Sequence, residues 1–222
     1  MHARVSVWFL AFAMLLLPLQ AAWAVDDEEA LKDYVKENTL KLVERLEAVR
    51  DTYADDRQKF YSEMDEALED FVAFRRIAAR VMGQYARQAS SEQRDKFVKA
   101  FRHSLYDAYG GAIVETGDFE LRVDSARINP RDENRATVNL TVITGGGGRY
   151  GVSYSMYRPD DGDWQMENVI VEGINIGLAF RDRFNQEMEE HRGDLQKVID
   201  NWSADVADID GLEEAVEEGG DE

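Results

Sequence analysis

The chain has 222 residues, of which 45 are acidic and 26 are lysine or arginine, so its formal net charge is −19. It contains no cysteine, which excludes disulfides, thiolate catalysis and zinc–thiolate sites. The acidic surplus leaves no basic stripe to neutralise phosphates, so we expect no nucleic-acid partner. Three histidines are too few for a histidine-rich metal site. We expect a soluble monomer without metal or cofactor.

The first 24 residues have the three-part layout of a secretory signal peptide. Arg4 is their only charged residue, an apolar run extends from Val5 to Leu17, and Ala22-Trp23-Ala24 forms a small-x-small cleavage pattern. The alternative is a membrane anchor, but the apolar run is shorter than the ~20 residues of a span and no basic cluster follows it. We therefore predict that residues 1–24 direct export and are removed after Ala24.

Apolar residues then recur with a helical period in four segments. The clearest segment begins at Ser90, which has Gln93 three residues later, the spacing of a capping box. Its apolar face carries large rings, and Gly110-Gly111 is expected to end it. The four predicted helices cover residues 27–53, 57–70, 71–82 and 90–109.

From residue 119 the period changes from 3.6 to 2, which is typical of strands. Short links at 145–148 and 159–162 join successive strands, so we expect antiparallel neighbours. Helical periodicity returns after Gly173. The predicted strands cover residues 119–123, 136–142, 150–156 and 164–172, and the last two predicted helices cover 176–188 and 195–206. This order predicts an α+β fold, with a four-stranded antiparallel, twisted sheet between N-terminal and C-terminal helices.

The chain shows no internal repeat and no long linker, so we predict a single domain from residue 25 to residue 204. Residues 205–222 contain nine acidic residues and no basic residue. Such a composition cannot bury much apolar surface, which predicts a disordered acidic tail.

Three features have the residue types of a functional site, and for each we favour a structural role. Gly146 to Gly151 matches G-x-G-x-x-G, but a strand rather than a helix follows it, so we predict a hairpin loop. Glu172 lies among valines and isoleucines, where a strand-end residue paired with a cation such as Arg181 is favoured over a catalytic base. His103 falls off the apolar stripe of its helix and is expected at a surface or boundary. No convincing catalytic set remains, so we predict that the protein is not an enzyme.

Two stretches of the chain resemble the toluene-tolerance auxiliary (MlaC) family. The first stretch joins Arg75-Arg76-Ile77-Ala78 to Val81-Met82-Gly83-Gln84-Tyr85 and continues from Ala89 to Arg102. The second contains Trp164, Asn168-Val169, Val171-Glu172-Gly173-Ile174-Asn175 and Phe180-Arg181. The resemblance extends over most of residues 30–202. The chain departs from the family at Asn175 and Phe180, where serine and tyrosine are frequent.

The resemblance implies a periplasmic carrier whose helices and twisted sheet enclose an apolar cavity for the acyl tails of a phospholipid. It also implies that the lipid passes between an outer-membrane lipoprotein–porin complex and an inner-membrane ABC transporter with its substrate-binding subunit. The candidate cavity-lining residues are large apolar side chains on the helix faces, on the sheet and at the junction between them: Phe74, Phe97, Phe101, Leu105, Tyr109, Val138, Leu140, Val142, Tyr154, Met156, Val171, Ile174, Ile176 and Phe180.

Each of these side chains has the alternative of packing in an ordinary filled core, and the sequence alone does not separate the two. Two other functions stay open. A periplasmic hydrolase-like enzyme on the same scaffold would need a carboxylate in a polar pocket, and a ligand-free adaptor would have a filled core and an exposed apolar patch. Gly173 and Gly177 flank the sheet-to-helix junction, where they would permit a hinge or mark a helix start and a close packing contact.

Overall fold

The computed structural model describes residues 20–49, 52–116 and 119–203. The apolar run of the predicted signal peptide and the predicted acidic tail lie outside the described residues, and the predicted cleavage point at Ala24 falls within the first helix. Among the described residues, no helix combines the length and the apolar character that a membrane crossing requires.

Helices form the part of the chain that precedes the sheet. The predicted helix over residues 27–53 is two helices, α1 and α2, and Asp56 then caps α3 because its side chain accepts a hydrogen bond from the Lys59 amide. The helices in this part are α1 (Gln20–Val49), α2 (Thr52–Asp55), α3 (Arg57–Leu68), α4 (Phe74–Met82), the 3₁₀ helix η1 (Gly83–Arg87) and α5 (Ser91–Thr116).

The predicted capping box at the start of α5 is confirmed. The Gln93 amide donates to Ser90 Oγ at 3.1 Å, and the Ser90 amide donates to Gln93 Oε1 at 3.0 Å. We expect Ser90→Ala to lower the free energy of unfolding by about 1 kcal/mol, because one amide of the first turn then loses its partner. Thermal unfolding measures this effect, with Ser91→Ala at the next, exposed position as the control. Equal melting temperatures for the two variants would contradict the prediction.

Three predicted helix boundaries were wrong. The last predicted helix, over residues 195–206, ends at Asp200. α4 begins at Phe74 rather than at residue 71, because the preceding residues pair with the sheet: the Met166 amide donates to the Phe71 carbonyl at 2.8 Å, and the Ala73 amide donates to the Met166 carbonyl at 2.9 Å. α5 does not end at Gly110-Gly111 but continues to Thr116. A glycine inside a helix costs only about 1 kcal/mol relative to alanine, and no proline follows to stop the helix.

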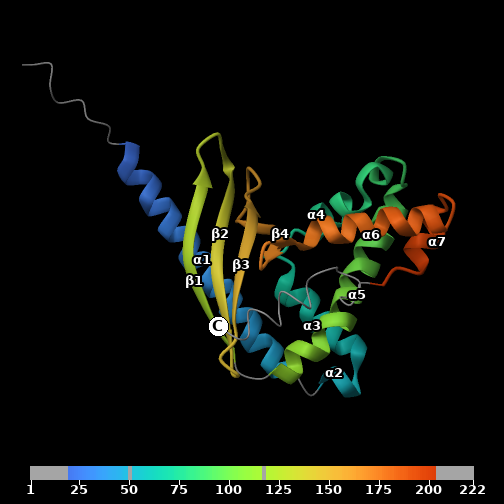
Figure 1. The fold of residues 1–222 in the computed structure, drawn as a ribbon, viewed down its shortest axis with the longest axis horizontal. Coiled ribbons are helices and arrows are strands. Elements are labelled where there is room, and N and C mark those ends of the chain that lie inside the picture. Colours follow the sequence, from blue (N-terminus) through green and yellow to red (C-terminus); the bar gives the residue numbers. More distant parts are fainter. Residues whose placement is uncertain (1–19, 50–51, 117–118, 204–222) are drawn as a thin grey trace, which may run out of the picture.

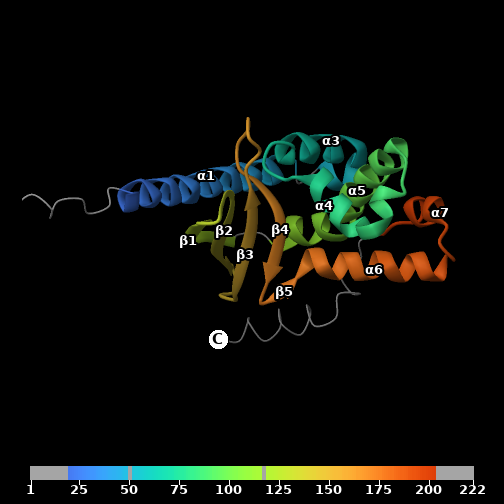
Figure 2. The same cartoon turned by 90° about the horizontal axis from the view of Figure 1, so that it is seen from above.

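The sheet is an antiparallel meander with the order β1-β2-β3-β4-β5. The four predicted strands are present, the first two of them longer than predicted, and a fifth follows. Its cause is a tight turn in which Glu172 and Gly173 have φ of 47° and 82°, so that Ile174 pairs with Val171. The strands are β1 (Phe119–Asn129), β2 (Asp132–Thr144), β3 (Arg149–Tyr157), β4 (Gln165–Val171) and β5 (Ile174–Asn175). Figure 1 labels the first four, and Figure 2 also labels β5.

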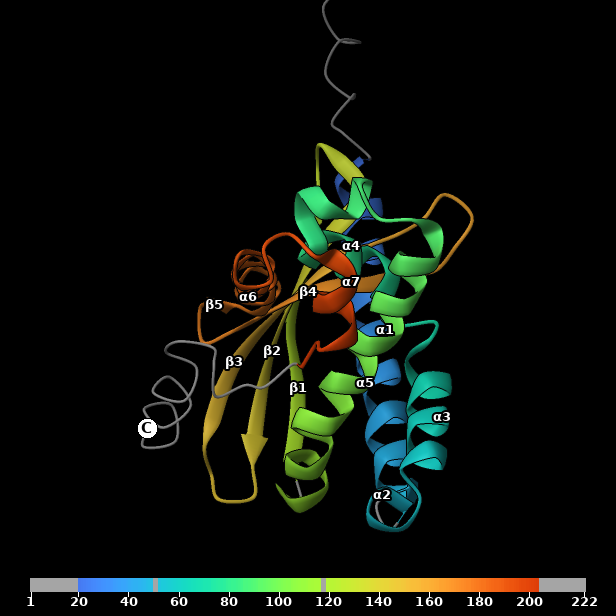
Figure 3. The ribbon, with the colours of Figure 1, turned by 90° about the vertical axis from the view of Figure 1, so that its right-hand side faces the viewer.

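The chain ends with α6 (Ile176–Glu190) and α7 (Leu195–Asp200). The side chain of Asn175 caps α6 by accepting a hydrogen bond from the Leu178 amide at 3.0 Å. α1 lies along one face of the sheet (Figure 2), with Leu31 and Val35 buried. Figure 3 shows the sheet on one side of the molecule and α1, α3 and α5 on the other. The predicted α+β architecture is therefore confirmed.

Candidate functional site

One face of the sheet is apolar across all five strands. Val138 pairs with Ala126 on β1 and with Tyr154 on β3, and Leu140 pairs with Val152, which in turn pairs with Val171. Directly paired residues share a face of a sheet, as do alternate residues of one strand. This register brings seven of the predicted cavity-lining residues together: Val138, Leu140, Val142, Tyr154, Met156, Val171 and Ile174. We call this surface the apolar sheet face.

The apolar sheet face is only partly covered. Val138, Leu140 and Met156 are 0–2 % exposed, whereas Val171 and Ile174 are half-buried. Val142 is half-buried as well. The covered side chains belong to the core, and the half-buried ones retain apolar surface that a ligand can contact.

Tyr154 has an unusual environment on the apolar sheet face. Burial raises the pKa of its hydroxyl to about 12, because removal from water disfavours the charged form. The side chain is half-buried rather than buried and keeps accessible surface. Tyr154 can therefore contact a ligand on the apolar sheet face.

Three residues near the apolar sheet face were missed by the sequence analysis. The ring of Phe71 lies 6.4 Å from the ring of Tyr154 and 6.2 Å from that of Tyr34 on α1. Thr39, on the same buried stripe of α1 as Val35, is 5 % exposed, and its hydroxyl has no hydrogen-bond partner within the described residues. Thr39 has a signal in the sequence: it follows Leu31 and Val35 at intervals of four residues, which places all three on one side of the helix.

A second apolar region lies between the helices. Phe97, Phe101 and Phe180 are 0–3 % exposed. Each of these rings packs edge-on against another aromatic ring. The ring centroids are 5.0 Å apart for Phe97 and Phe184, 5.4 Å for Phe101 and Phe180, and 5.2 Å for Phe97 and Trp202. The structure therefore places these three predicted residues in an aromatic core, the alternative that the sequence left open.

The other predicted residues lie apart from the apolar sheet face. Phe74 is buried at the start of α4, with the Arg102 guanidinium 5.3 Å from its ring centroid. Leu105 and Ile176 are half-buried against the core. The side chain of Tyr109 lies outside the described residues.

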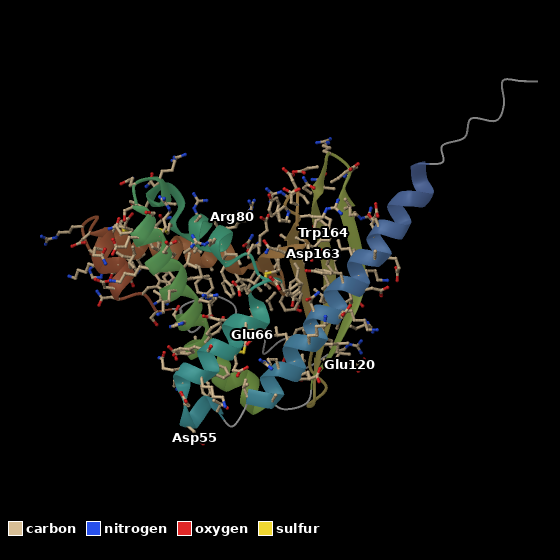
Figure 4. The ribbon with its side chains drawn as sticks, turned by 180° about the vertical axis from the view of Figure 1, so that it is seen from behind. Asp55, Glu66, Arg80, Glu120, Asp163 and Trp164 are labelled. Carbon is tan, nitrogen blue, oxygen red and sulfur yellow. The ribbon has the colours of Figure 1, made fainter. Side chains whose placement is uncertain are left out.

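The opposite face of β3 and β4 borders a polar pocket of about 530 Å³ between α4 and α6. Two guanidinium groups, from Arg80 and Arg181, contribute to its lining, together with the side chains of Ser155, Asn168 and Asn175. Figure 4 shows Arg80 where the helices meet the sheet. A further pocket of about 510 Å³, which Arg75 and Arg102 help to line, also has a mixed lining with several charged residues. Neither pocket is lined by apolar residues alone, so the apolar cavity stays a prediction.

The floor of the polar pocket contains a buried carboxylate. Glu167 is 4 % exposed and sits at a bulge, the extra residue between the pairs Ser155–Asn168 and Met156–Met166. It accepts hydrogen bonds from Arg76 Nε at 3.0 Å and Arg80 Nη2 at 2.9 Å, and it also pairs with Arg135. Burial alone would raise the pKa of Glu167, but these guanidinium groups hold it below its ordinary value. The sequence contains one signal for this cluster, the spacing of Arg76 and Arg80, which lie one turn apart on α4 and therefore on the same side of the helix.

The two candidate catalytic residues have structural roles. Glu172 does not pair with Arg181: it accepts a hydrogen bond from the Gly151 amide, and its own amide donates to the Gly151 carbonyl at 2.9 Å. His103 is half-buried and stacks on Tyr61, with ring centroids 4.4 Å apart, and burial lowers its pKa. Among the described residues, no group of histidines and carboxylates is placed to hold a metal ion.

Gly177 marks a close packing contact at the polar pocket. Its amide donates to Asn168 Oδ1 at 3.1 Å, and a Cβ at this position would lie 2.3 Å from the same oxygen. We expect Gly177→Ala to destabilise the fold by about 1–3 kcal/mol, because Asn168 must move and release the start of α6. Gly146→Ala is the control, since its nearest neighbour would be 4.0 Å away. Chemical denaturation measures the free energy of unfolding of the two variants. Equal values would show that the contact between Gly177 and Asn168 does not stabilise the fold.

Comparison with known proteins gives the context of this arrangement. The family model described as MlaC protein matches residues 36–204. The toluene tolerance protein ttg2D of Pseudomonas putida is 35 % identical over 176 residues, covering 79 % of this chain and 80 % of that protein. The intermembrane phospholipid transport system binding protein MlaC of Haemophilus influenzae is 19 % identical over 175 residues, covering 78 % of this chain and 81 % of that protein.

A solved structure has the same fold. It is the phospholipid-binding protein of Ralstonia solanacearum in complex with a phospholipid, with a TM-score of 0.67 and 18 % identity, covering 85 % of this chain and 97 % of that one. The family model covers well over half of the chain, and the Pseudomonas relative is similar over most of its length. The chain therefore belongs to the MlaC family.

Proposed function

We propose that residues 25–204 form a periplasmic carrier of phospholipid, exported by residues 1–24. The observation that carries this proposal is the apolar sheet face, whose residues Val142, Tyr154, Val171 and Ile174 keep accessible surface within the fold. Membership of the MlaC family supports it, as do the names of the Haemophilus and Ralstonia proteins, which refer to phospholipid transport and phospholipid binding.

The physical task explains why such a surface is needed. Each buried CH₂ group contributes about 0.8 kcal/mol, so exposing one sixteen-carbon acyl chain to water costs roughly 12 kcal/mol. A carrier must replace the bilayer with an apolar surface of similar quality. We place the acyl tails against the apolar sheet face, where valine and isoleucine side chains offer contact without recognising a particular head group.

The same proposal includes the route of the lipid. We propose that the carrier exchanges phospholipid with an outer-membrane lipoprotein–porin complex and with an inner-membrane ABC transporter that has a substrate-binding subunit. The aromatic core between α5, α6 and α7 is continuous with the buried part of the apolar sheet face. We place the lipid on the half-buried part of that face, and we expect the helical part to keep its packing when a lipid enters or leaves.

The test is to purify the protein from the periplasm and to analyse it by native mass spectrometry and by organic extraction. We expect bound phospholipid to be recovered with both acyl chains intact. Lipid-free protein that also acquires no phospholipid from vesicles would refute the carrier function. Recovery of lysophospholipid or free fatty acid would instead favour a hydrolase.

A further inference from the structure

The polar pocket holds more positive charge than its own carboxylate can balance. Arg76, Arg80 and Arg135 surround the single carboxylate of Glu167. Arg181 lines the same pocket, is exposed, and has no ion-pair or hydrogen-bond partner within the described residues. The chain as a whole carries a net charge of −19. The pocket is therefore a cationic site on an otherwise acidic protein, and it attracts carboxylates.

Large apolar side chains also contribute to the lining of the polar pocket. Leu178, one of the lining residues, is 50 % exposed, which is unusual for a large apolar side chain in the described part of the chain. Ile77 is another lining residue. A ligand that fits this site has carboxylates for Arg80 and Arg181 and an apolar side chain for Leu178.

The C-terminal segment of the same chain has this chemistry. Residues 205–222 contain nine acidic residues, no basic residue, and four large aliphatic side chains interspersed with the acids, namely Val206, Ile209, Leu212 and Val216. We propose that this acidic segment docks into the polar pocket, with its carboxylates on Arg80 and Arg181 and an apolar side chain on Leu178.

The geometry permits this docking within one molecule. The ring of Trp202 lies 5.7 Å from that of Phe184 on α6, and Phe184 is one helical turn, about 5 Å along the axis, from Arg181. A random coil of n residues spans about 5–6 Å times √n, so Leu212 lies about 17 Å from Ser203 on average. The segment therefore reaches the pocket without stretching, which keeps its effective concentration there high.

The absence of cysteine makes a direct test possible. The full exported chain with Ala215→Cys carries one nitroxide spin label on the acidic segment, and the broadening of backbone amide signals is measured by NMR. We expect strong broadening of the amides of Gly83, Gly177 and Leu178 around the pocket, and little at Ser62, which is exposed on α3. We expect the selective broadening to be lost at about 1 M salt, where the Debye length is about 3 Å.

A matched pair of variants tests whether the polar pocket causes the selective broadening. Arg181→Gln removes a guanidinium group that has no partner in the described fold, and we expect broadening around the pocket to fall to the level at Ser62. Arg75→Gln removes a guanidinium group of α4 that is 75 % exposed and pairs with Asp95, and we expect the broadening to persist. Similar broadening for both variants would overturn the proposal, as would uniform broadening in the parent chain.

A mixed sample separates docking within one molecule from docking between molecules. Isotope-labelled protein without the nitroxide is mixed with spin-labelled protein that carries no isotope. We expect no selective broadening in this sample. If broadening of the pocket amides persists in this sample, the occupant is the acidic segment of a second copy, and the intramolecular proposal is wrong.

Discussion

Val171→Glu is expected to remove most of the bound phospholipid without unfolding the protein. Val171 is half-buried on the apolar sheet face, near the end of β4. A carboxylate there retains water while the protein is empty, but a bound acyl chain would bury it without a partner, at a cost of several kcal/mol. Lipid content per protein after organic extraction measures the loss, and circular dichroism checks the fold.

The matched control is Ile170→Glu on the neighbouring position of the same strand. Ile170 is also half-buried, but it pairs with Ser153 and points to the opposite face of the sheet. We expect this variant to carry normal amounts of lipid. Leu140→Glu is a poor test, since Leu140 is 2 % exposed and the substitution would disrupt the core. Equal loading of the two β4 variants would refute the assignment of the acyl tails to this face.

Glu167→Gln is expected to cause the largest loss of stability among the substitutions considered. The change leaves Arg76, Arg80 and Arg135 around an uncharged side chain. Removing one partner of a buried ionic cluster costs about 3–5 kcal/mol, and we expect the lower end because the three arginines are 34–47 % exposed. A loss of about 3 kcal/mol corresponds to a melting temperature lower by about 6–12 °C in a domain of this size. Glu66→Gln is the control, since that carboxylate is 76 % exposed.

The pH dependence of this difference follows from the lowered pKa of Glu167. A carboxylate whose pKa is lower in the folded protein than in the unfolded chain stabilises the fold fully above its ordinary value of 4.5. This contribution decreases as the pH falls below that value and is lost once the pH passes the lowered pKa. We therefore expect the melting temperatures of parent and Glu167→Gln to differ at pH 7 and to converge in acid. A constant difference would show that the charge of Glu167 does not stabilise the fold.

Patterns of local spacing predicted much of this fold. The capping box of Ser90 and Gln93 gave the start of α5. The two-residue period gave four of the five strands, their direction and the shared face of Val138 and Tyr154. Family membership agrees with the predicted carrier and with the absence of a catalytic set. These features depend on residues that are close in sequence or on a regular repeat, so the sequence contains them directly.

The features that were missed depend on contacts between distant segments. Val72 pairs with Met166 through the backbone groups of Phe71 and Ala73, which delays the start of α4, and no local signal shows this. The sequence left open whether Phe97 and Phe101 belong to a core or to a ligand site, because they have the same periodicity whether a lipid or Trp202 faces them. Glu167 escaped notice because a bulge interrupts the two-residue period, and its three partners come from α4 and β2.

β4 separates two unlike environments, which constrains how its gene segment can change. Val169 and Val171 face the apolar side, while Asn168 and Ile170 face the opposite side. A point mutation alters one side at a time, whereas gain or loss of one codon exchanges the two sides for the rest of the strand. The extra residue at Glu167 is accommodated where three arginines hold it. We therefore expect relatives to vary along β4 by substitution, and to place insertions in the loops at 145–148 and 159–162.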